Sequence, residues 1–410
     1  MPSPARPRLR PLESIVVPDP EHGRVLVLRD TQGIAEGQAV LPPPLIPVVA
    51  LFDGNHTVRE IAALASRELG RDVPKDFVEG LARELDEAFF LETPRFERER
   101  ERVEQRFRDA TVRPAAHAGG AYHGDATKLR EYLESECLAR APRQRDASRR
   151  GRVRGLVAPH IDPWRGAAGY GRSYAALAAG LTDDVETFVI FGTSHAPMRA
   201  PFSVCPKAFD TPFGSVPVDD AACARLANAA RFDVHADLMN HKREHSIEFQ
   251  VVFLKHLLGA RPFRIVPILA GLGRQQARRT DPSKDADVEA FLDSVRELVD
   301  RTKAVVIAGA DMAHVGPRFG DRSPYDAEAR DVLERRDRAS LASARSDGAR
   351  EFWEHVVEDL DTRRVCGLAP IYSLLRVLEA VTATSELVHY EQTVDAEDGS
   401  IVSHAGVALG

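Results

Sequence analysis

The sequence predicts an α/β protein with a mostly parallel sheet flanked by helices, preceded by a small winged-helix-like N-terminal domain. Three observations support this prediction. Several short apolar runs lack polar alternation, as buried parallel strands do. Helical stretches separate these runs, which is the pattern of successive βα units. A pair of short helices after a proline-rich break predicts the small domain.

The composition is typical of a globular protein and argues against several other classes. The chain has 410 residues, enough for one large core and a smaller module. Its net charge of -7 gives no general reason to expect a nucleic-acid partner. We find no apolar segment of membrane-spanning length and no apolar region of a signal peptide near the start. The four cysteines form no C-x-x-C pair, so we expect a cytoplasmic, reduced protein.

Residues 1–94 predict the small domain. Apolar residues alternate over Glu13 to Arg29, which predicts a hairpin that turns at His22-Gly23. After a proline cluster, Thr57 is placed to cap a helix and Glu60 completes a capping box. A second helix is expected over Lys75 to Ala88, and one face of it would carry Phe77, Leu81, Leu85 and Phe89.

These elements, with a short strand at Phe90-Leu91, outline a winged-helix-like module. The segment Leu51-Phe-Asp-Gly54, followed by Thr57-Val-Arg-Glu-Ile61, resembles PqqD-like domains. That resemblance implies a peptide ligand, because PqqD-like domains bind peptides in peptide-modification systems. A packing module without a ligand is the alternative. Residues 95–112 are dense in Arg and Glu and predict a solvated helical linker.

Residues 113–410 alternate between expected strands and helices. Buried strands are predicted over 153–158, 187–191, 263–269 and 303–308, with a final strand over 402–409. Helices are predicted over 173–181, 221–230, 246–258, 287–301, 325–344 and 371–381. In such sheets, ligands bind beyond the carboxyl ends of the strands.

Three of the predicted strands are followed by a histidine. The sequence Pro159-His160-Ile161-Asp162 follows the first, Gly192-Thr-Ser-His195 the second, and Gly309-Ala-Asp311-Met-Ala-His314 the fourth. A single histidine after a strand is usually a turn or surface residue. Three at one edge of a sheet are hard to attribute to chance. Neutral imidazoles that converge at one edge suit a transition metal.

Two further segments carry groups of the same kind. Glu244-His245-Ser246 opens a predicted helix, so its polar groups would point toward the strand ends, although helix capping explains part of this pattern. Cys366 lies just before the last predicted helix, where a lowered thiol pKa would make it a metal ligand or a nucleophile. The other cysteines, Cys137, Cys205 and Cys223, have no histidine nearby and are expected to be inert.

Read in order, the motifs of residues 113–410 resemble the Memo family, whose prokaryotic members are often called AmmeMemoRadiSam system protein B. The motifs are His117-Ala-Gly-Gly-Ala-Tyr122, Ala158-Pro-His160, Gly192-Thr-Ser-His195, Glu244-His-Ser-Ile-Glu248, Asp311-Met-Ala-His314 and Cys366-Gly367. This family is similar in fold to class III (LigB-type) extradiol dioxygenases, which use non-haem iron. The resemblance implies that His160, His195 and Cys366 bind the metal. It also implies that Asp311 and His314 line the pocket, with His314 matching the acid/base histidine of the dioxygenases.

The sequence departs from both groups of relatives. Memo proteins usually continue Ala-Pro-His with Ala-Gly-Tyr, whereas here several residues intervene before Gly169-Tyr170. Asp162, Arg165, Tyr170 and Glu244 are therefore our candidates for binding a small-molecule substrate. Where the dioxygenases have a carboxylate ligand, this chain has Cys366. A thiolate favours softer ions such as copper(I), so the expected metal is iron or copper, with zinc also possible.

Three functions are compatible with these residues. The first is a metal-dependent redox enzyme in which His314 or His245 moves protons and Asp311 orients a neighbour. The second is a non-catalytic protein that binds a peptide or a partner such as a radical-SAM enzyme, which the N-terminal module favours. The third is metal storage by the same ligands.

Overall fold

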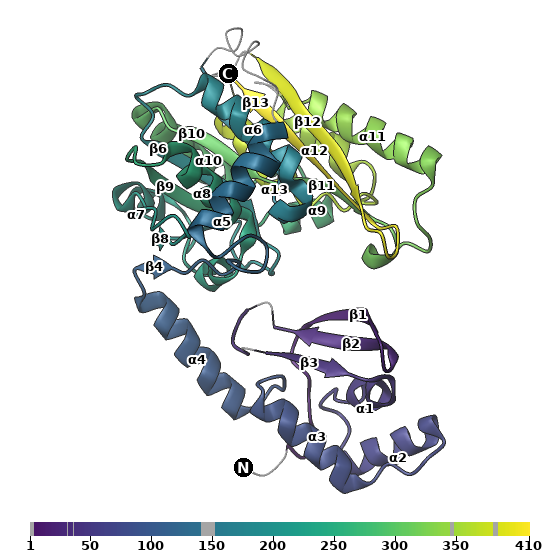
Figure 1. Cartoon of the computed structure of the whole chain (residues 1–410). Coiled ribbons are helices and arrows are strands. Elements are labelled where there is room, and N and C mark those ends of the chain that lie inside the picture. Colours follow the sequence, from purple (N-terminus) through teal and green to yellow (C-terminus); the bar gives the residue numbers. More distant parts are fainter. Residues whose placement is uncertain (1–3, 31, 36, 141–151, 345–347, 380–383) are drawn as a thin grey trace. The chain divides into compact units, whose positions relative to one another are not determined.

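A computed structural model describes the chain except for residues 1–3, 31, 36, 141–151, 345–347 and 380–383. The chain divides into two compact units, Met1–Ala110 and Thr111–Gly410 (Figure 1). The charged segment that follows residue 94 falls within the first unit, as helix α4. Each unit has its own buried core, and we describe each by itself.

The first unit contains a three-stranded antiparallel sheet and four α-helices among its described residues. The predicted hairpin is present and turns at Gly23, whose φ of 73° suits glycine. Thr57 and Glu60 form the predicted capping box. The strands, the third of which was not predicted, are β1 (Glu13–Asp19), β2 (Gly23–Arg29) and β3 (Gln38–Leu41). The helices are α1 (Ile46–Ala50), α2 (Val58–Leu69), α3 (Lys75–Glu87) and α4 (Pro94–Asp109).

Two local predictions for this unit are wrong. Phe77 was expected on the buried face of α3 but is 47% exposed. The helix instead buries Val78, Ala82 and Leu85, which are spaced four and three residues apart and so share one face. Phe90-Leu91 does not form a strand, because Leu91 makes only an isolated bridge to Leu9.

Helix α4 matches the prediction of a charged helix but is not solvated on every side. Phe96, Val103 and Phe107 are buried along it, and the guanidinium of Arg10 lies 4.8 Å from the ring centroid of Phe96. Ion pairs such as Arg102–Glu99 occupy the rest of its surface. This apolar stripe was not predicted, because charged residues greatly outnumber apolar ones along the segment.

The second unit is built around an eight-stranded sheet in the order β11-β13-β5-β10-β6-β9-β7, with β12 paired to β13. The four central strands run parallel, which confirms the predicted α/β fold. The strands at both margins are antiparallel, and three of them (β7, β11 and β12) were not predicted. The bounds are β5 (Gly155–Ala158), β6 (Thr187–Thr193), β7 (Phe202–Val204), β9 (Arg264–Ala270), β10 (Val305–Gly309), β11 (Asp311–Val315), β12 (Ser385–Val394) and β13 (Ile401–Leu409). A separate two-stranded ladder joins β4 (Val112–Arg113) to β8 (Ala208–Phe209).

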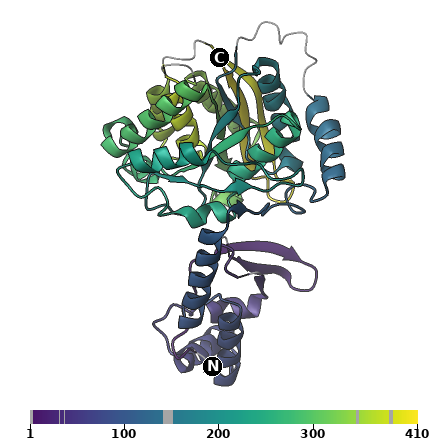
Figure 2. The same ribbon diagram turned by 90° about the vertical axis from the view of Figure 1, so that its left-hand side faces the viewer.

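Helices flank this sheet (Figure 2). The main apolar core joins the sheet to α10, α12 and α13, whereas α6 and α8 pack together through Tyr170, Tyr174 and Phe253. Helix α6 begins ten residues before the predicted start of 173 because Asp162 caps it and Pro163 occupies its first position. Ala380 and Val381, the last two residues of the helix predicted over 371–381, lie outside the described residues. The helices are α5 (Ala126–Tyr132), α6 (Pro163–Gly180), α7 (Asp220–Ala229), α8 (His245–Leu258), α9 (Gly273–Arg278), α10 (Ala286–Thr302), α11 (Ala327–Ala342), α12 (Ala349–Val357) and α13 (Leu368–Val377).

The register of the central strands positions the site. Gly309 of β10 stands opposite Ala158 of β5 and Gly192 of β6. These strands therefore end level with one another, and the residues just beyond them meet at one edge. None of the helices that the structure describes is long and apolar enough to cross a membrane.

Candidate metal centre

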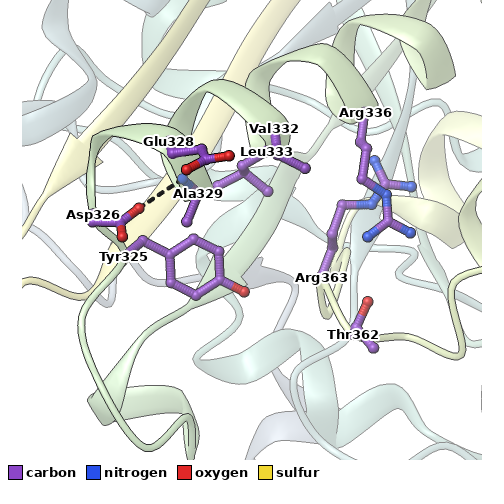
Figure 3. Close-up of a pocket in the computed structure, with 9 residues that line it drawn as sticks. All are labelled: Tyr325, Asp326, Glu328, Ala329, Val332, Leu333, Arg336, Thr362 and Arg363. Carbon is purple, nitrogen blue, oxygen red and sulfur yellow. Dashed lines mark hydrogen bonds between the residues drawn. The ribbon is translucent and has the colours of Figure 1, made fainter.

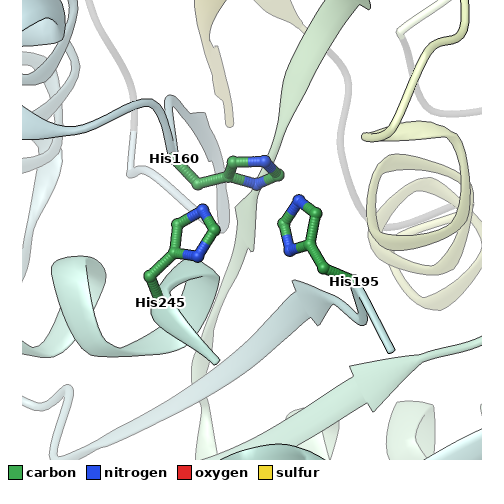
Figure 4. A group of neighbouring side chains, drawn as sticks. All are labelled: His160, His195 and His245. Atoms are coloured by element: carbon green, nitrogen blue, oxygen red, sulfur yellow. The ribbon is translucent and has the colours of Figure 1, made fainter. Parts of the chain in front are cut away.

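Three histidines converge beyond the ends of β5 and β6 (Figure 4). His160 follows β5, His195 follows β6, and His245 is the first residue of α8. One ring nitrogen of each lies within 4.8 Å of the others, so the group could hold a metal ion. The ring centroids are 4.6 to 5.3 Å apart. His245 was predicted to move protons, and the structure also places it among the possible ligands.

Cys366 lies against this group. Its Sγ is 3.3 Å from Nε2 of His160. The chain can approach so closely because Gly367 follows: a Cβ at Gly367 would stand only 2.3 Å from the carbonyl oxygen of Asp311. The structure thus brings His160, His195 and Cys366, the three predicted ligands, to one place, with His245 beside them.

Hydrogen bonds fix which nitrogen of each ring is free. Nδ1 of His160 lies 2.9 Å from the carbonyl oxygen of Gly309, which can only accept, so Nδ1 donates and Nε2 is the nitrogen that faces Cys366. Nδ1 of His195 lies 3.0 Å from Oε1 of Glu244 and is held in the same way. This pairing of a ligand histidine with a carboxylate or carbonyl oxygen is common around metals, because it orients the ring and raises its basicity.

Glu244 was predicted to bind substrate, but its contacts point to positioning. The side chain is buried, and Oε2 accepts a hydrogen bond from the backbone N–H of His195 at 2.9 Å. Oε1 accepts from the backbone N–H groups of His245 and Ser246, so the same carboxylate caps α8. Its acceptor sites are therefore used to hold His195 and the start of the helix.

The electrostatics favour a thiolate. Desolvation opposes ionisation of Cys366, but the facing His160 and His314 lower its pKa well below the usual value. Desolvation likewise lowers the pKa of His160, but the charges of Cys366 and Asp311 raise it to about 9. Burial holds the pKa of His245 well below its usual value, so that imidazole is neutral. Thiolate and imidazole are ligands of transition metals, so the donor set fits such an ion, whose binding would displace the proton that His160 shares with Cys366.

Asp311 and His314 adjoin the same group. Oδ1 of Asp311 accepts a hydrogen bond from the backbone N–H of His160 at 2.9 Å. His314 was expected beyond the end of a strand but lies within β11, and its backbone N–H donates a hydrogen bond to the carbonyl oxygen of Arg363. Desolvation lowers the pKa of His314, but the Cys366 charge raises it above its usual value. Asp311 thus positions the backbone of His160, and His314 interacts electrostatically with Cys366.

Comparison with known proteins identifies the second unit. Residues 113–408 match the family model described as Memo-like protein. The chain belongs to the Memo family. A MEMO1 family protein of Aquifex aeolicus is 27% identical over 389 residues, which are 95% of this chain and 96% of that protein. Because the second unit has only 300 residues, that alignment extends into the first unit.

Other relatives align with a smaller part of the chain. A MEMO1 family protein of Archaeoglobus fulgidus is 31% identical and covers 62% of this chain and 85% of its own length. The protein memo-1 homolog of Caenorhabditis elegans is 26% identical over 73% of this chain and 82% of its own length. Among solved structures, uncharacterized protein JW3007 of Escherichia coli covers 63% of this chain and 100% of its own, with 17% identity and a TM-score of 0.37.

The predicted substrate residues of this Memo domain differ in their surroundings. Tyr170 is buried, its hydroxyl donates to the carbonyl oxygen of Ile161, and its ring stacks on Phe253. Both the ring and the hydroxyl of Tyr170 are thus engaged within the protein, and a role in binding substrate stays a prediction. Asp162 and Arg165 pair with each other at 2.5 Å near the start of α6, and both remain partly accessible.

Sequence reasoning left Arg113 and Glu248 without a role. They form a fully buried ion pair, and Glu248 also accepts hydrogen bonds from the Tyr122 hydroxyl and from the backbone N–H of His117. Arg113 also donates to the carbonyl oxygen of Glu244. The pair thus ties the first segment of the Memo domain to α8, which carries His245. Charged residues inside an otherwise apolar motif were the available signal.

A cavity of about 460 Å³ lies beside α11 (Figure 3). Its wall includes Tyr325, Arg336 and Arg363, and Arg363 is held by Asp337 and Asp359. None of the histidines of the metal centre lines this cavity, nor does Cys366. It is therefore separate from the candidate metal centre.

Proposed function

We propose that this protein is a metal-dependent redox protein whose Memo domain holds iron or copper through His160, His195 and Cys366. The observation that carries this proposal is the 3.3 Å approach of Cys366 Sγ to Nε2 of His160, while Nδ1 of that ring is occupied by Gly309. His195 is prepared in the same way by Glu244. Among the possible ions, thiolate favours copper(I), and the imidazoles suit copper, iron and zinc alike.

The residues around the proposed metal ligands are assigned roles in proton transfer, positioning and substrate binding. A bound iron or copper ion would supply electron exchange with a substrate. His314, beside the sulfur and still without a partner for its Nδ1 among the described residues, is placed to hold or release a proton. Asp311 positions the His160 backbone, and Asp162 and Arg165 offer charged groups to a small-molecule substrate. Ring cleavage does not follow from the fold, because a thiolate stands where the dioxygenases have a carboxylate.

Metal analysis of the purified full chain tests the proposal. We expect His160→Ala and Cys366→Ala each to contain about one equivalent of iron or copper less than the wild type. Cys223→Ala is the matched control, because Cys223 is buried away from the histidines. Unchanged metal content in both site variants would show that these residues are not the ligands. Oxygen consumption with catechols then separates an enzyme from a metal-storage protein.

A second candidate function rests on the first unit, in which β1 and β3 are the edges of the sheet. Val16 and Val40 on these strands are 54% and 50% exposed. An exposed edge strand can pair with an extended peptide, as a PqqD-like module working with a radical-SAM partner would require. A screen of labelled extended peptides against the full chain tests this. Binding should weaken in Val40→Lys, and a screen without any bound peptide would reject the function.

A further inference from the structure

A second group of metal-binding side chains lies on β12 and β13, outside the candidate metal centre. Glu391 stands directly opposite His404 in the strand pairing, and His389 is two residues from Glu391. Nε2 of His389 is 3.0 Å from Oε2 of Glu391. One ligand atom of each of these three residues lies within 4.8 Å of the others. Strand alternation puts His389 and Glu391 on one face, so the register creates the group.

The buried ring of His404 has an unsatisfied nitrogen. The side chain is 0% exposed, and Nε2 is 3.0 Å from the Thr393 hydroxyl. Nδ1 has no hydrogen-bond partner among the described residues. Buried polar atoms are almost always paired, so an orphaned ring nitrogen beside a histidine and a carboxylate calls for an explanation.

Helix α6 approaches His389 and His404 closely at Gly169. A Cβ at Gly169 would lie 3.0 Å from Nδ1 of His404 and 3.1 Å from Cδ2 of His389. Because Gly169 has no side chain, no side-chain atom from this position lies between helix α6 and the two rings. Glu391 is the accessible member, with 41% of its side chain exposed, so an ion could reach the group from solvent.

We propose that His389, Glu391 and His404 form a second metal site, which takes a divalent ion of intermediate hardness such as Zn²⁺ or Fe²⁺. Two imidazoles and one carboxylate suit such ions, whereas the thiolate of Cys366 favours softer ones. Hydrogen bonds explain His389–Glu391 and His404–Thr393 without an ion, but they leave Nδ1 of His404 unexplained. The site does not depend on the proposed function of the first centre.

The second site adjoins the first through Asp311. In the pairing of β11 with β13, Asp311 stands opposite His404, and Oδ1 of Asp311 accepts a hydrogen bond from the backbone N–H of His160. A cation held by His404 would therefore lie near the carboxylate that positions a ligand of the first centre. An ion there also joins β12 to β13 through side chains as well as backbone hydrogen bonds.

Co²⁺ titration of the full chain tests the proposal, because this probe reports the two sites differently. Cobalt bound to Cys366 gives a thiolate-to-metal charge-transfer band, whereas a site of nitrogen and oxygen ligands gives only weak ligand-field bands. Equilibrium dialysis counts the ions bound. We expect two equivalents in the wild type and one in Glu391→Gln and His404→Gln, with the charge-transfer band retained.

His22→Gln is the matched control. His22 pairs with Asp19 at 2.9 Å on the surface and belongs to neither group of possible metal ligands, so this variant should keep both equivalents. Glu391→Gln changes a half-exposed side chain and serves as the main variant should His404→Gln fail to fold. A single wild-type equivalent that carries the charge-transfer band, or unchanged stoichiometry in Glu391→Gln, would overturn the second site. One equivalent without that band, lost in Glu391→Gln, would support the second site and reject the first centre.

Discussion

The carboxylate of Glu244 holds His195 at two points. Oε2 accepts a hydrogen bond from the backbone N–H of His195 at 2.9 Å, and Oε1 lies 3.0 Å from Nδ1 of its ring. His195 is therefore oriented before any ion binds, although 42% of its side chain is exposed. Removing the charge of Glu244 should affect the metal more than the fold.

Glu244→Gln should weaken metal binding by about 10- to 100-fold, the usual cost of losing a group that orients a metal ligand. Competition with a chromophoric chelator would measure the affinity. Asp237→Asn is the matched control, because the buried Asp237 also accepts hydrogen bonds from two backbone N–H groups but contacts no histidine of the centre. Equal losses of affinity in both variants would mean that the effect is general destabilisation.

Gly367→Ala should displace Cys366 from His160, because its Cβ would meet the Asp311 carbonyl oxygen at 2.3 Å. We expect a loss of about 1 to 3 kcal/mol in the free energy of unfolding, together with weaker metal binding. Gly273→Ala, at the start of α9, places its Cβ more than 4 Å from any neighbouring atom and should change neither. Wild-type metal affinity in Gly367→Ala would contradict the close packing of this segment.

Arg113→Met should leave the Glu248 carboxylate buried without its cation. We expect a loss of about 3 to 5 kcal/mol in the free energy of unfolding, which is typical of breaking a buried ion pair from one side. Tryptophan fluorescence during denaturant unfolding reports the second unit specifically, because both tryptophans, Trp164 and Trp353, lie in it. Arg100→Ala in the first unit is the comparison, because it breaks an exposed ion pair with Glu97. It should lower the free energy of unfolding, followed by circular dichroism, by less than about 1 kcal/mol.

His241 should make the second unit labile to acid. Its ring is buried with Nε2 3.0 Å from the carbonyl oxygen of Ser203, and burial lowers its pKa to about 3. The charge of Arg113 lowers this pKa further, while Glu244 raises it. Between pH 6.5 and about 3 the unfolded chain binds a proton at His241 that the folded chain does not.

The stabilising contribution of neutral His241 is therefore complete above pH 6.5 and is lost as the pH falls toward 3. The expected slope is about 1.4 kcal/mol of unfolding free energy per pH unit. His241→Gln, which keeps a hydrogen-bond donor for Ser203, should flatten the fluorescence-detected stability profile in this range. A slope of the same steepness in His241→Gln would assign the acid lability to other groups.

Much of the candidate centre could be predicted because it follows from local sequence. Parallel strands of similar length end at one edge, so the residues after β5, β6 and β10 were expected to meet there. His160, His195 and Asp311 lie at that edge. The positions of residues that act through packing were harder to predict from the sequence. Nothing in the spacing of Tyr170 shows that it stacks on Phe253, and Phe77 lies one helical position away from the buried face of α3.

Four features could be predicted from the sequence alone: the α/β class, the capping box of α2, the parallel centre of the sheet and the edge at which the histidines gather. Apolar runs and helical spacing encode these features within a few residues. The contacts between side chains from distant segments became known only from the three-dimensional structure. In the folded chain Cys366 contacts His160, which is 206 residues away in the sequence. The Glu244 carboxylate lies within hydrogen-bond distance of the His195 ring, and Glu391 pairs with His404 on the neighbouring strand. The physical reason is that pairing register and close packing join residues from distant segments, so they leave no local periodicity in the sequence.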